Sequence, residues 1–156
     1  DARFALSMSW FARGGAGVDR LAANIGNFFR NIQEESASEN RLCGSFANCK
    51  GKIKGKGYTK AIVPFNLRAT NEYRTRNCLV YAVNVFMNAN EKRYYSEHGS
   101  PVDEDAYALS TMVQWIWRSA IREGNEVDIY IPSRRMRDLL RDWIETVSKG
   151  VTAGAA

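Results

Sequence analysis

The stretch DAYALSTMVQWIWRSAIREGNEVDIYI, residues 105–131, predicts a long helix that leads directly into a strand. Apolar residues recur at three- and four-residue steps over its first part, which is typical of a helix with a buried face. We expect this helix to run from about Asp105 to Arg122 and to stop at Glu123-Gly124-Asn125. The residues of Val127–Ile131 then alternate as a strand does. A helix followed by a strand after a short turn indicates an α/β fold.

Other segments extend the same alternation of helices and strands. An apolar stripe predicts a helix over Val18–Ile32, and Ser133 is placed to cap a last helix. Two apolar runs predict strands: Ala61–Phe65, which Pro64 assigns to a sheet edge or to an early end, and Cys78–Phe86, whose continuous run is typical of a parallel strand covered on both faces. The sequence therefore predicts a three-layer α/β domain with a mainly parallel sheet flanked by helices.

The polar segments between these elements are expected to be loops and helix starts. Gln33–Asn48 has no apolar periodicity, which predicts a loop. Ser100 precedes a proline and three acids, so we expect it to cap the helix that follows. These predictions describe one domain and a short tail: the domain over residues 1–149, with a helical and basic lead-in over 1–59 and a motif-bearing part over 60–149, and a flexible tail over residues 150–156.

The composition is that of a basic globular protein. A chain of 156 residues suits one domain, and the net charge of +5 with a pI near 9.2 favours an anionic partner without identifying it. No apolar run approaches the roughly 20 residues that span a bilayer, so we expect a cytoplasmic protein with no membrane partner. Cys43, Cys49 and Cys78 form no CxxC pair and His98 is the only histidine, so we interpret the thiols as reduced and expect no metal site.

Five lysines lie within eleven residues and alternate with glycines: Lys50, Lys52, Lys54, Lys56 and Lys60, with Gly51, Gly55 and Gly57 between them. Glycine leaves the backbone free to follow a ligand, and the ammonium groups suit the phosphates of a nucleic-acid chain. The alternative is a solvated loop whose lysines repel one another. The sequence leaves both interpretations open.

Three polar residues lie at four-residue steps on the predicted 105–122 helix: Gln114, Arg118 and Arg122. At that spacing they share one stripe of a helix. Guanidinium groups on an otherwise apolar helix are costly to bury unless anions or hydrogen-bond acceptors meet them, and their planar fork suits phosphate and carboxylate. The alternative is that this stripe is the solvated face of the helix, and periodicity alone does not separate the two.

The order of these residues resembles the last motif of superfamily 2 helicases, in which a glutamine is followed by two arginines, a glycine turn and a strand. Here it reads Gln114-Trp115-Ile116-Trp117-Arg118-Ser119-Ala120-Ile121-Arg122-Glu123-Gly124. Upstream, Arg68-Ala69-Thr70-Asn71 follows a predicted strand and resembles the preceding motif of that family. Over residues 60–143 the chain thus resembles the C-terminal RecA-like lobe of helicase-like proteins from phages and mobile elements.

The resemblance implies a role for each matching residue. Arg118 and Arg122 would be arginine fingers that stabilise charge on an ATP bound mainly by another lobe, and Gln114 would bond near the nucleotide. A second set would contact the nucleic-acid backbone: Arg68, Thr70 and Asn71. The expected partners are single- or double-stranded nucleic acid and a missing N-terminal motor lobe or partner chain. The sequence has no P-loop, so ATP and Mg²⁺ are expected only with that lobe, and the chain alone should not hydrolyse ATP.

The chain departs from the family's pattern at three positions. Trp117 stands where the family has glycine, Arg122 follows Arg118 by four residues rather than three, and Ala69 replaces a glycine of the upstream loop. These departures suit either a divergent motor or a lobe that keeps only the fold.

The alternative function is a non-enzymatic adaptor that binds nucleic acid or packs within a larger complex. Its footprint would be the lysine loop and a basic helix with Arg134, Arg135, Arg137 and Arg141. A hydrolase or nuclease is disfavoured because no acid–base or metal-binding set of residues assembles.

Overall fold

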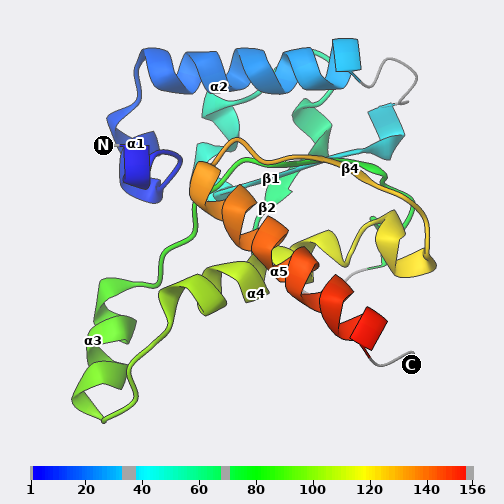
Figure 1. Cartoon of the computed structure of the whole chain (residues 1–156). Helices are drawn as coiled ribbons and strands as arrows, with labels where there is room; N and C mark the ends of the chain where they lie inside the picture. Colours follow the sequence, from blue (N-terminus) through cyan, green and yellow to red (C-terminus); the bar gives the residue numbers. More distant parts are fainter. Residues whose placement is uncertain (1, 33–37, 68–70, 154–156) are drawn as a thin grey trace.

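The computed structural model describes residues 2–32, 38–67 and 71–153, which form four strands and five α-helices (Figure 1). In chain order these are α1 (Met8–Arg13), α2 (Ala16–Asn27), β1 (Arg41–Ser45), β2 (Ile62–Pro64), β3 (Cys78–Tyr81), α3 (Ala89–Glu97), α4 (Glu104–Ile116), β4 (Asp128–Tyr130) and α5 (Arg134–Ala153). Short 3-10 helices join several of them.

The four strands form one parallel sheet in the order β2-β1-β3-β4. β1 lies inside the sheet, where Cys43 is opposite Ile62 of β2 and Val80 of β3, and Val80 is in turn opposite Tyr130 of β4. β2 is an edge strand, as Pro64 predicted, because proline has no N–H to donate to a further strand. The expected parallel sheet is therefore confirmed.

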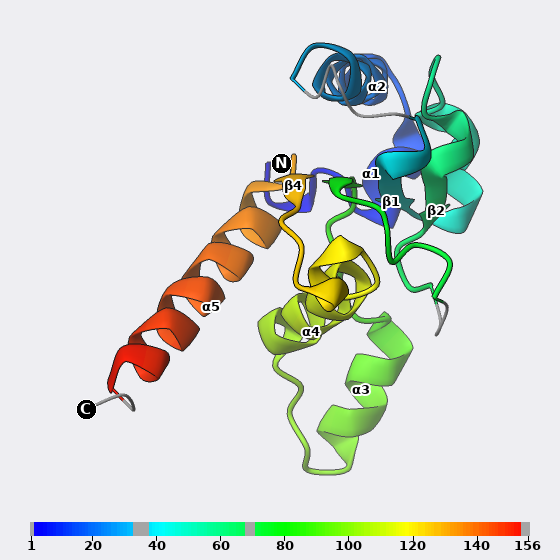
Figure 2. The same cartoon turned by 90° about the vertical axis from the view of Figure 1, so that its right-hand side faces the viewer.

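Helices cover both faces of the sheet and complete three layers. Figure 1 places α2 above the sheet and α4 with α5 below it. On the α2 side, Phe28 stacks on Tyr130 with ring centroids 5.4 Å apart. On the other side, the ring of Trp115 in α4 lies 5.2 Å from that of Tyr81 in β3. Figure 2 shows that α3 and the end of α5 extend away from this layered body.

β1 corrects the prediction of a loop over Gln33–Asn48, of which residues 33–37 lie outside the described ranges. The strand has few large apolar residues besides Leu42, so its sequence lacks the run that marks the other strands. Gly44 packs under the indole of Trp115, and a Cβ there would lie 3.0 Å from the indole carbons. Ser45 ends the strand fully buried. A central strand built from small residues makes room for α4 and therefore resembles a loop in sequence.

The N-cap residue of α4 differs from the predicted one. Asp103, rather than Ser100, is the N-cap residue. One carboxylate oxygen of Asp103 accepts hydrogen bonds from the N–H groups of Asp105 (2.9 Å) and Ala106 (3.0 Å). An acid at this position also interacts favourably with the positive end of the helix dipole.

Other boundaries shift by a few residues. α2 ends at Asn27 and continues as a π-helix over Phe28–Ile32, so the predicted first helix is confirmed in two parts. β3 ends at Tyr81, although the chain stays buried beyond it. α5 reaches Ala153, so residues 150–153 of the expected flexible tail are helical, and residues 154–156 lie outside the described part.

Candidate functional site

The connections of β1 create a switch point in the sheet. The chain leaves β1 for β2 on one side and then crosses to β3 on the other. In open α/β sheets, ligands bind outside the carboxyl ends of the strands near such a point. Here the carboxyl ends are Ser45, Pro64, Tyr81 and Tyr130. A ligand-binding site is therefore expected among the residues just beyond these ends.

A hollow of about 250 Å³ lies beyond the carboxyl end of β2, between that strand and α4. Gln114 and Arg118, two of the predicted site residues, line it. The lining contains no aspartate or glutamate: Phe65, Asn66, Leu67, Tyr107, Thr111, Gln114, Trp115 and Arg118. The Nε of Arg118 is buried and has no hydrogen-bond partner among the described residues. The hollow thus offers one positive charge and no carboxylate in its lining, which suits an anion.

The predicted stripe of Gln114, Arg118 and Arg122 on one helix is wrong. α4 ends at Ile116, and Arg122 lies in a separate 3-10 helix, Ala120–Glu123. Two hydrogen bonds explain the break.

The first of these bonds caps the helix end, because the buried hydroxyl of Ser119 donates to the carbonyl of Ile116 at 2.6 Å. The second comes from the chain before β3, where the carbonyl of Arg76 accepts from the N–H of Ala120 at 2.8 Å. These bonds take the groups that would continue the helix.

Arg122 nevertheless contacts the second predicted motif. Its Nη1 donates to Oδ1 of Asn71 at 2.8 Å, joining side chains 51 residues apart. Arg68 and Thr70, the other predicted residues of that motif, lie outside the described residues. Within the described residues, the two motifs therefore meet at the connection between β2 and β3.

Gln114 and Trp117 both face solvent. The amide of Gln114 donates to the hydroxyl of Ser110 at 3.1 Å, so its expected role near a nucleotide stays a prediction. Trp117 is 55% exposed and has a φ of −63°, a value open to any residue. The tryptophan in place of the family's glycine is thus accommodated without strain.

Two aromatic residues behind the hollow hold buried polar atoms without partners in the described structure: Nε1 of Trp115 and the hydroxyl of Tyr81. Burial raises the pKa of Tyr81, with a smaller contribution from Tyr107. Trp115 itself is 1% exposed and belongs to the core. The sequence carried no signal for Tyr81 as a neighbour of this hollow, because it lies within a continuous apolar run.

The lysine loop lies at the other end of the strands. Lys56 and Lys60 line a hollow before the start of β2, whereas Arg118 lies beyond its end. Lys52 donates to the carbonyl of Phe11 and so helps to hold α1. The predicted lysines and arginines are therefore not brought together in one site.

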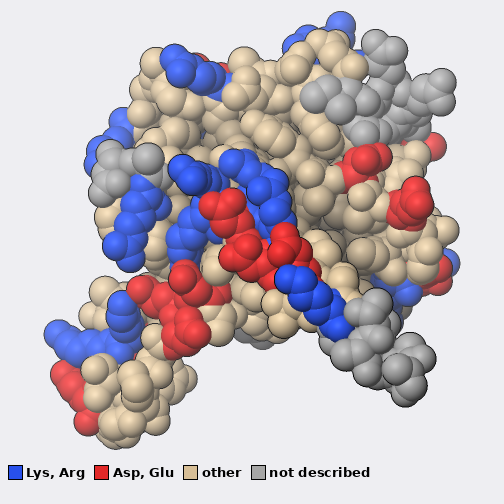
Figure 3. Space-filling model, in the orientation of Figure 1, with Lys and Arg blue, Asp and Glu red and all other residues tan. Residues whose placement is uncertain are grey.

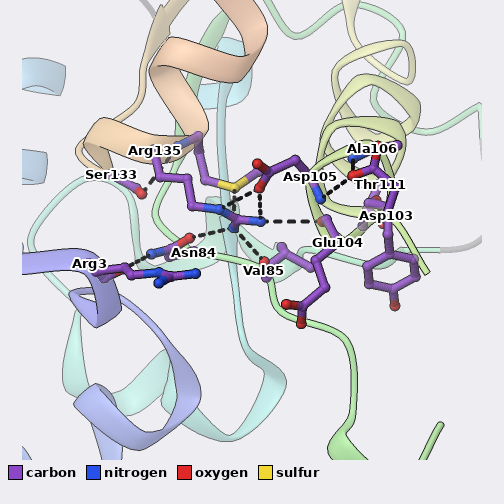
Figure 4. A network of polar contacts seen from close by, with 12 residues as sticks. Arg3, Asn84, Val85, Asp103, Glu104, Asp105, Ala106, Thr111, Ser133 and Arg135 are labelled. Carbon is purple, nitrogen blue, oxygen red and sulfur yellow. Dashed lines mark hydrogen bonds and ion pairs between the residues drawn. The ribbon is translucent and has the colours of Figure 1, made fainter. Parts of the chain in front are cut away.

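Arg135, one of the arginines in the predicted basic footprint, is engaged within the fold. Figure 4 shows its guanidinium between α4, α5 and the segment after β3. It donates to Oδ1 of Asn84 (3.0 Å), the carbonyl of Val85 (2.8 Å), the carbonyl of Glu104 (3.2 Å) and, through two nitrogens, Oδ1 of Asp105 (2.9 and 2.6 Å). Such a cluster of acceptors holds the three segments together.

Fewer arginines of the predicted basic helix are therefore available to contact a partner of an adaptor. Figure 3 shows basic side chains around the start of α5, with acidic side chains beside them. Arg137 donates to the carbonyl of Ile131 at 2.7 Å, so it too is engaged within the fold. Arg134 is 89% exposed and lies 3.5 Å from Asp138.

Cys43, Cys49 and Cys78 are buried, and none of them forms a disulfide within the described part of the chain. Within residues 2–32, 38–67 and 71–153, no group of three or more His, Cys, Asp or Glu is placed to hold a metal ion. No helix in these ranges is long and apolar enough to cross a membrane.

Comparison with known protein families places the chain in one of them. A family model described as the YonV C-terminal Rossmann-like domain matches residues 1–144. The chain belongs to this family. It is similar to the SPbeta prophage-derived uncharacterized protein YonV of Bacillus subtilis (strain 168), with 46% identity over 145 residues that cover 93% of the chain and 35% of that protein. No solved structure matches the chain.

The YonV C-terminal domain family confirms part of what the helicase resemblance implied. The Rossmann-like fold and a prophage relative agree with it, and the superfamily 2 assignment stays a prediction. The chain spans about a third of the prophage protein. It is thus similar to one domain of a larger protein.

Proposed function

We propose that this chain is the second lobe of an ATP-dependent helicase or translocase, which supplies positive charge to a nucleotide held by another lobe. The supporting observation is the 2.8 Å hydrogen bond between Arg122 and Asn71. These residues belong to the two segments that the helicase resemblance pairs. A contact between segments so distant in sequence is set by the fold rather than by local geometry.

The hollow around Arg118 suits the chemistry that such a lobe would perform. In phosphoryl transfer, negative charge builds on the equatorial oxygens of the transferred group, and an arginine finger stabilises it. Arg118 lines an open hollow without a neighbouring carboxylate, and its buried Nε lacks an acceptor within the described part of the chain. The charge of this guanidinium would attract a phosphate group in the hollow.

The remaining parts of the ATP site would come from elsewhere. The sequence has no G-x-x-x-x-G-K-[ST] motif to bind the β- and γ-phosphates and to place Mg²⁺. The bound Mg²⁺ would supply charge stabilisation at the β- and γ-phosphate oxygens. In a protein of the prophage relative's length, about two-thirds of the chain would be available for a lobe with those groups, because the match covers 35% of it.

A chimera tests the proposal, with this chain replacing the matching 35% of the prophage relative. Arg118→Ala with Arg122→Ala should lower nucleic-acid-stimulated ATP turnover by about 100-fold or more, while nucleic-acid affinity stays within about threefold. The matched control is Arg93→Ala with Arg141→Ala, which removes two exposed arginines from α3 and α5 and should leave turnover unchanged.

The adaptor predicts a different result for the same chimera. An adaptor would show no ATP turnover, or turnover that the two arginines do not affect, and either result would contradict the motor. The internal hydrogen bonds of Arg135 and Arg137 weaken the adaptor's helical footprint but leave its lysine loop in place.

A further inference from the structure

A second hollow, of about 490 Å³, lies at the amino ends of the strands. It is formed by segments that immediately precede β1, β2 and β3. Its charged lining consists of Glu39, Lys56, Lys60 and Arg76. This edge is opposite to the carboxyl edge where ligands of open α/β sheets bind. The hollow is therefore separate from the Arg118 site.

Three positive groups face a single carboxylate in this hollow, which gives the lining a formal charge of +2. Neither Lys56 nor Lys60 forms an ion pair with an acid in the described ranges. Both ammonium groups are therefore available to an anion from solution.

Arg76 is held in place at the side of the hollow. Its Nη1 lies 3.3 Å from the carbonyl oxygens of both Ser38 and Arg41. Its Nε is buried and has no hydrogen-bond partner among the described residues. The guanidinium is therefore held with its positive charge beside the hollow.

The turn that carries Lys56 is also fixed before any ligand arrives. The hydroxyl of Thr59 accepts from the N–H of Gly55 at 3.1 Å and lies 2.8 Å from its carbonyl. Gly57 has a φ of +85°, and its carbonyl accepts from Arg41 at 3.1 Å. A turn closed in this way limits the conformational entropy lost on binding.

We propose that the hollow binds a phosphate group through Lys56, Lys60 and Arg76. The lysines supply charge from a fixed turn, and the guanidinium of Arg76 adds a third positive charge beside the hollow. The phosphate belongs either to a nucleic-acid backbone or to a free phosphate compound. The site does not depend on the motor function, because it shares no residue with the Arg118 hollow.

Titrations of the isolated chain with two probes test this site. The first probe is an oligothymidylate of about 20 nucleotides at about 50 mM salt. Lys56→Ala with Lys60→Ala should weaken its binding by about tenfold or more and reduce the slope of log K against log salt by about 1.4, or about 0.7 per lost contact. Lys50→Ala with Lys54→Ala removes the same charge from the same loop outside the hollow and should change affinity by less than about threefold.

The second probe, pyrophosphate, distinguishes the source of the phosphate. Binding of both probes that depends on Lys56 and Lys60 indicates a general phosphate site. Dependence with oligothymidylate alone indicates a backbone site, and dependence with pyrophosphate alone indicates a site for free phosphate compounds. Equal effects of the two lysine pairs, or no binding of either probe, would overturn the proposal.

Arg76→Gln provides an independent variant, since it removes the positive charge but keeps an amide that can donate hydrogen bonds, as Nη1 does to the carbonyls of Ser38 and Arg41. It should weaken the binding of whichever probe depends on Lys56 and Lys60, while the thermal midpoint stays close to that of the wild-type chain. All these titrations omit ATP, so their failure would leave the Arg118 proposal standing.

Discussion

Gly44 of the central strand β1 packs directly against Trp115 of α4. An added Cβ would lie 3.0 Å from two carbons of the Trp115 indole, and both residues are in the buried core. Gly51, by contrast, has nothing within 4 Å of its Cβ position and no positive φ. Packing against Trp115 therefore favours glycine at position 44, whereas neither packing nor φ favours it at position 51.

Gly44→Ala should lower the free energy of unfolding by about 1–3 kcal/mol, because the indole cannot move far in a packed core. Gly51→Ala should leave it unchanged or raise it by a few tenths of a kcal/mol to about 1 kcal/mol. Urea unfolding of both variants makes the comparison. Equal effects would contradict the packing of Trp115 on β1.

Cys43 gives stability a dependence on alkaline pH. Burial raises the pKa of this thiol from its ordinary value of 9.0 to about 12. The unfolded chain then loses the thiol proton near pH 9 while the folded chain retains it. The stabilisation is complete below pH 9 and is lost as the pH rises towards 12.

The free energy of unfolding should therefore fall above pH 9 with a contribution of about 1.4 kcal/mol per pH unit from this thiol. Cys43→Ala should remove that contribution. The measurement is urea unfolding between pH 9 and 10 with a reductant present, below the range where Tyr58, with its pKa raised to about 12 from 10.0, adds a similar effect. An unchanged slope in the alanine variant would contradict burial of the thiol.

At the scale of elements, α4 shows where sequence patterns stop being informative. The apolar repeat correctly predicted a helix, but it continued past Ile116, where the helix ends. No proline or glycine marks the break. The helix ends because the Ser119 hydroxyl and the Arg76 carbonyl form hydrogen bonds there. The Arg76 carbonyl accepts from the N–H of Ala120, which is 44 residues away in the sequence. A boundary set by a distant hydrogen bond cannot be derived from local periodicity.

Arg135 should be the arginine that connects α5 to the rest of the domain. Arg135→Ala should lower the free energy of unfolding by about 2–4 kcal/mol, because it leaves acceptors in two segments, the one after β3 and the start of α4, without a donor. Arg134→Ala removes the preceding arginine, which is 89% exposed, and should change it by less than about 0.5 kcal/mol. Thermal unfolding can compare the two, and equal destabilisation would show that the network adds nothing.

For the whole molecule, the sequence predicted three of the four strands and the layers around them, because large apolar residues mark buried strands. It did not predict β1, whose Gly44 and Ser45 are small for reasons of packing. The site was predicted in part. Gln114 and Arg118 share a hollow and Arg122 contacts Asn71, whereas the lysines lie at the opposite edge because strand direction places them there.

The affinity of the chimera for a transition-state analogue, ADP with aluminium fluoride and Mg²⁺, tests the motor proposal most directly. An arginine finger stabilises the transition state more than the ground state. Arg118→Ala should therefore weaken binding of the analogue by about 100-fold or more while ADP affinity stays within about threefold, and Arg141→Ala should change neither. Equal losses for the analogue and ADP, or no loss for either, would contradict the assignment of Arg118.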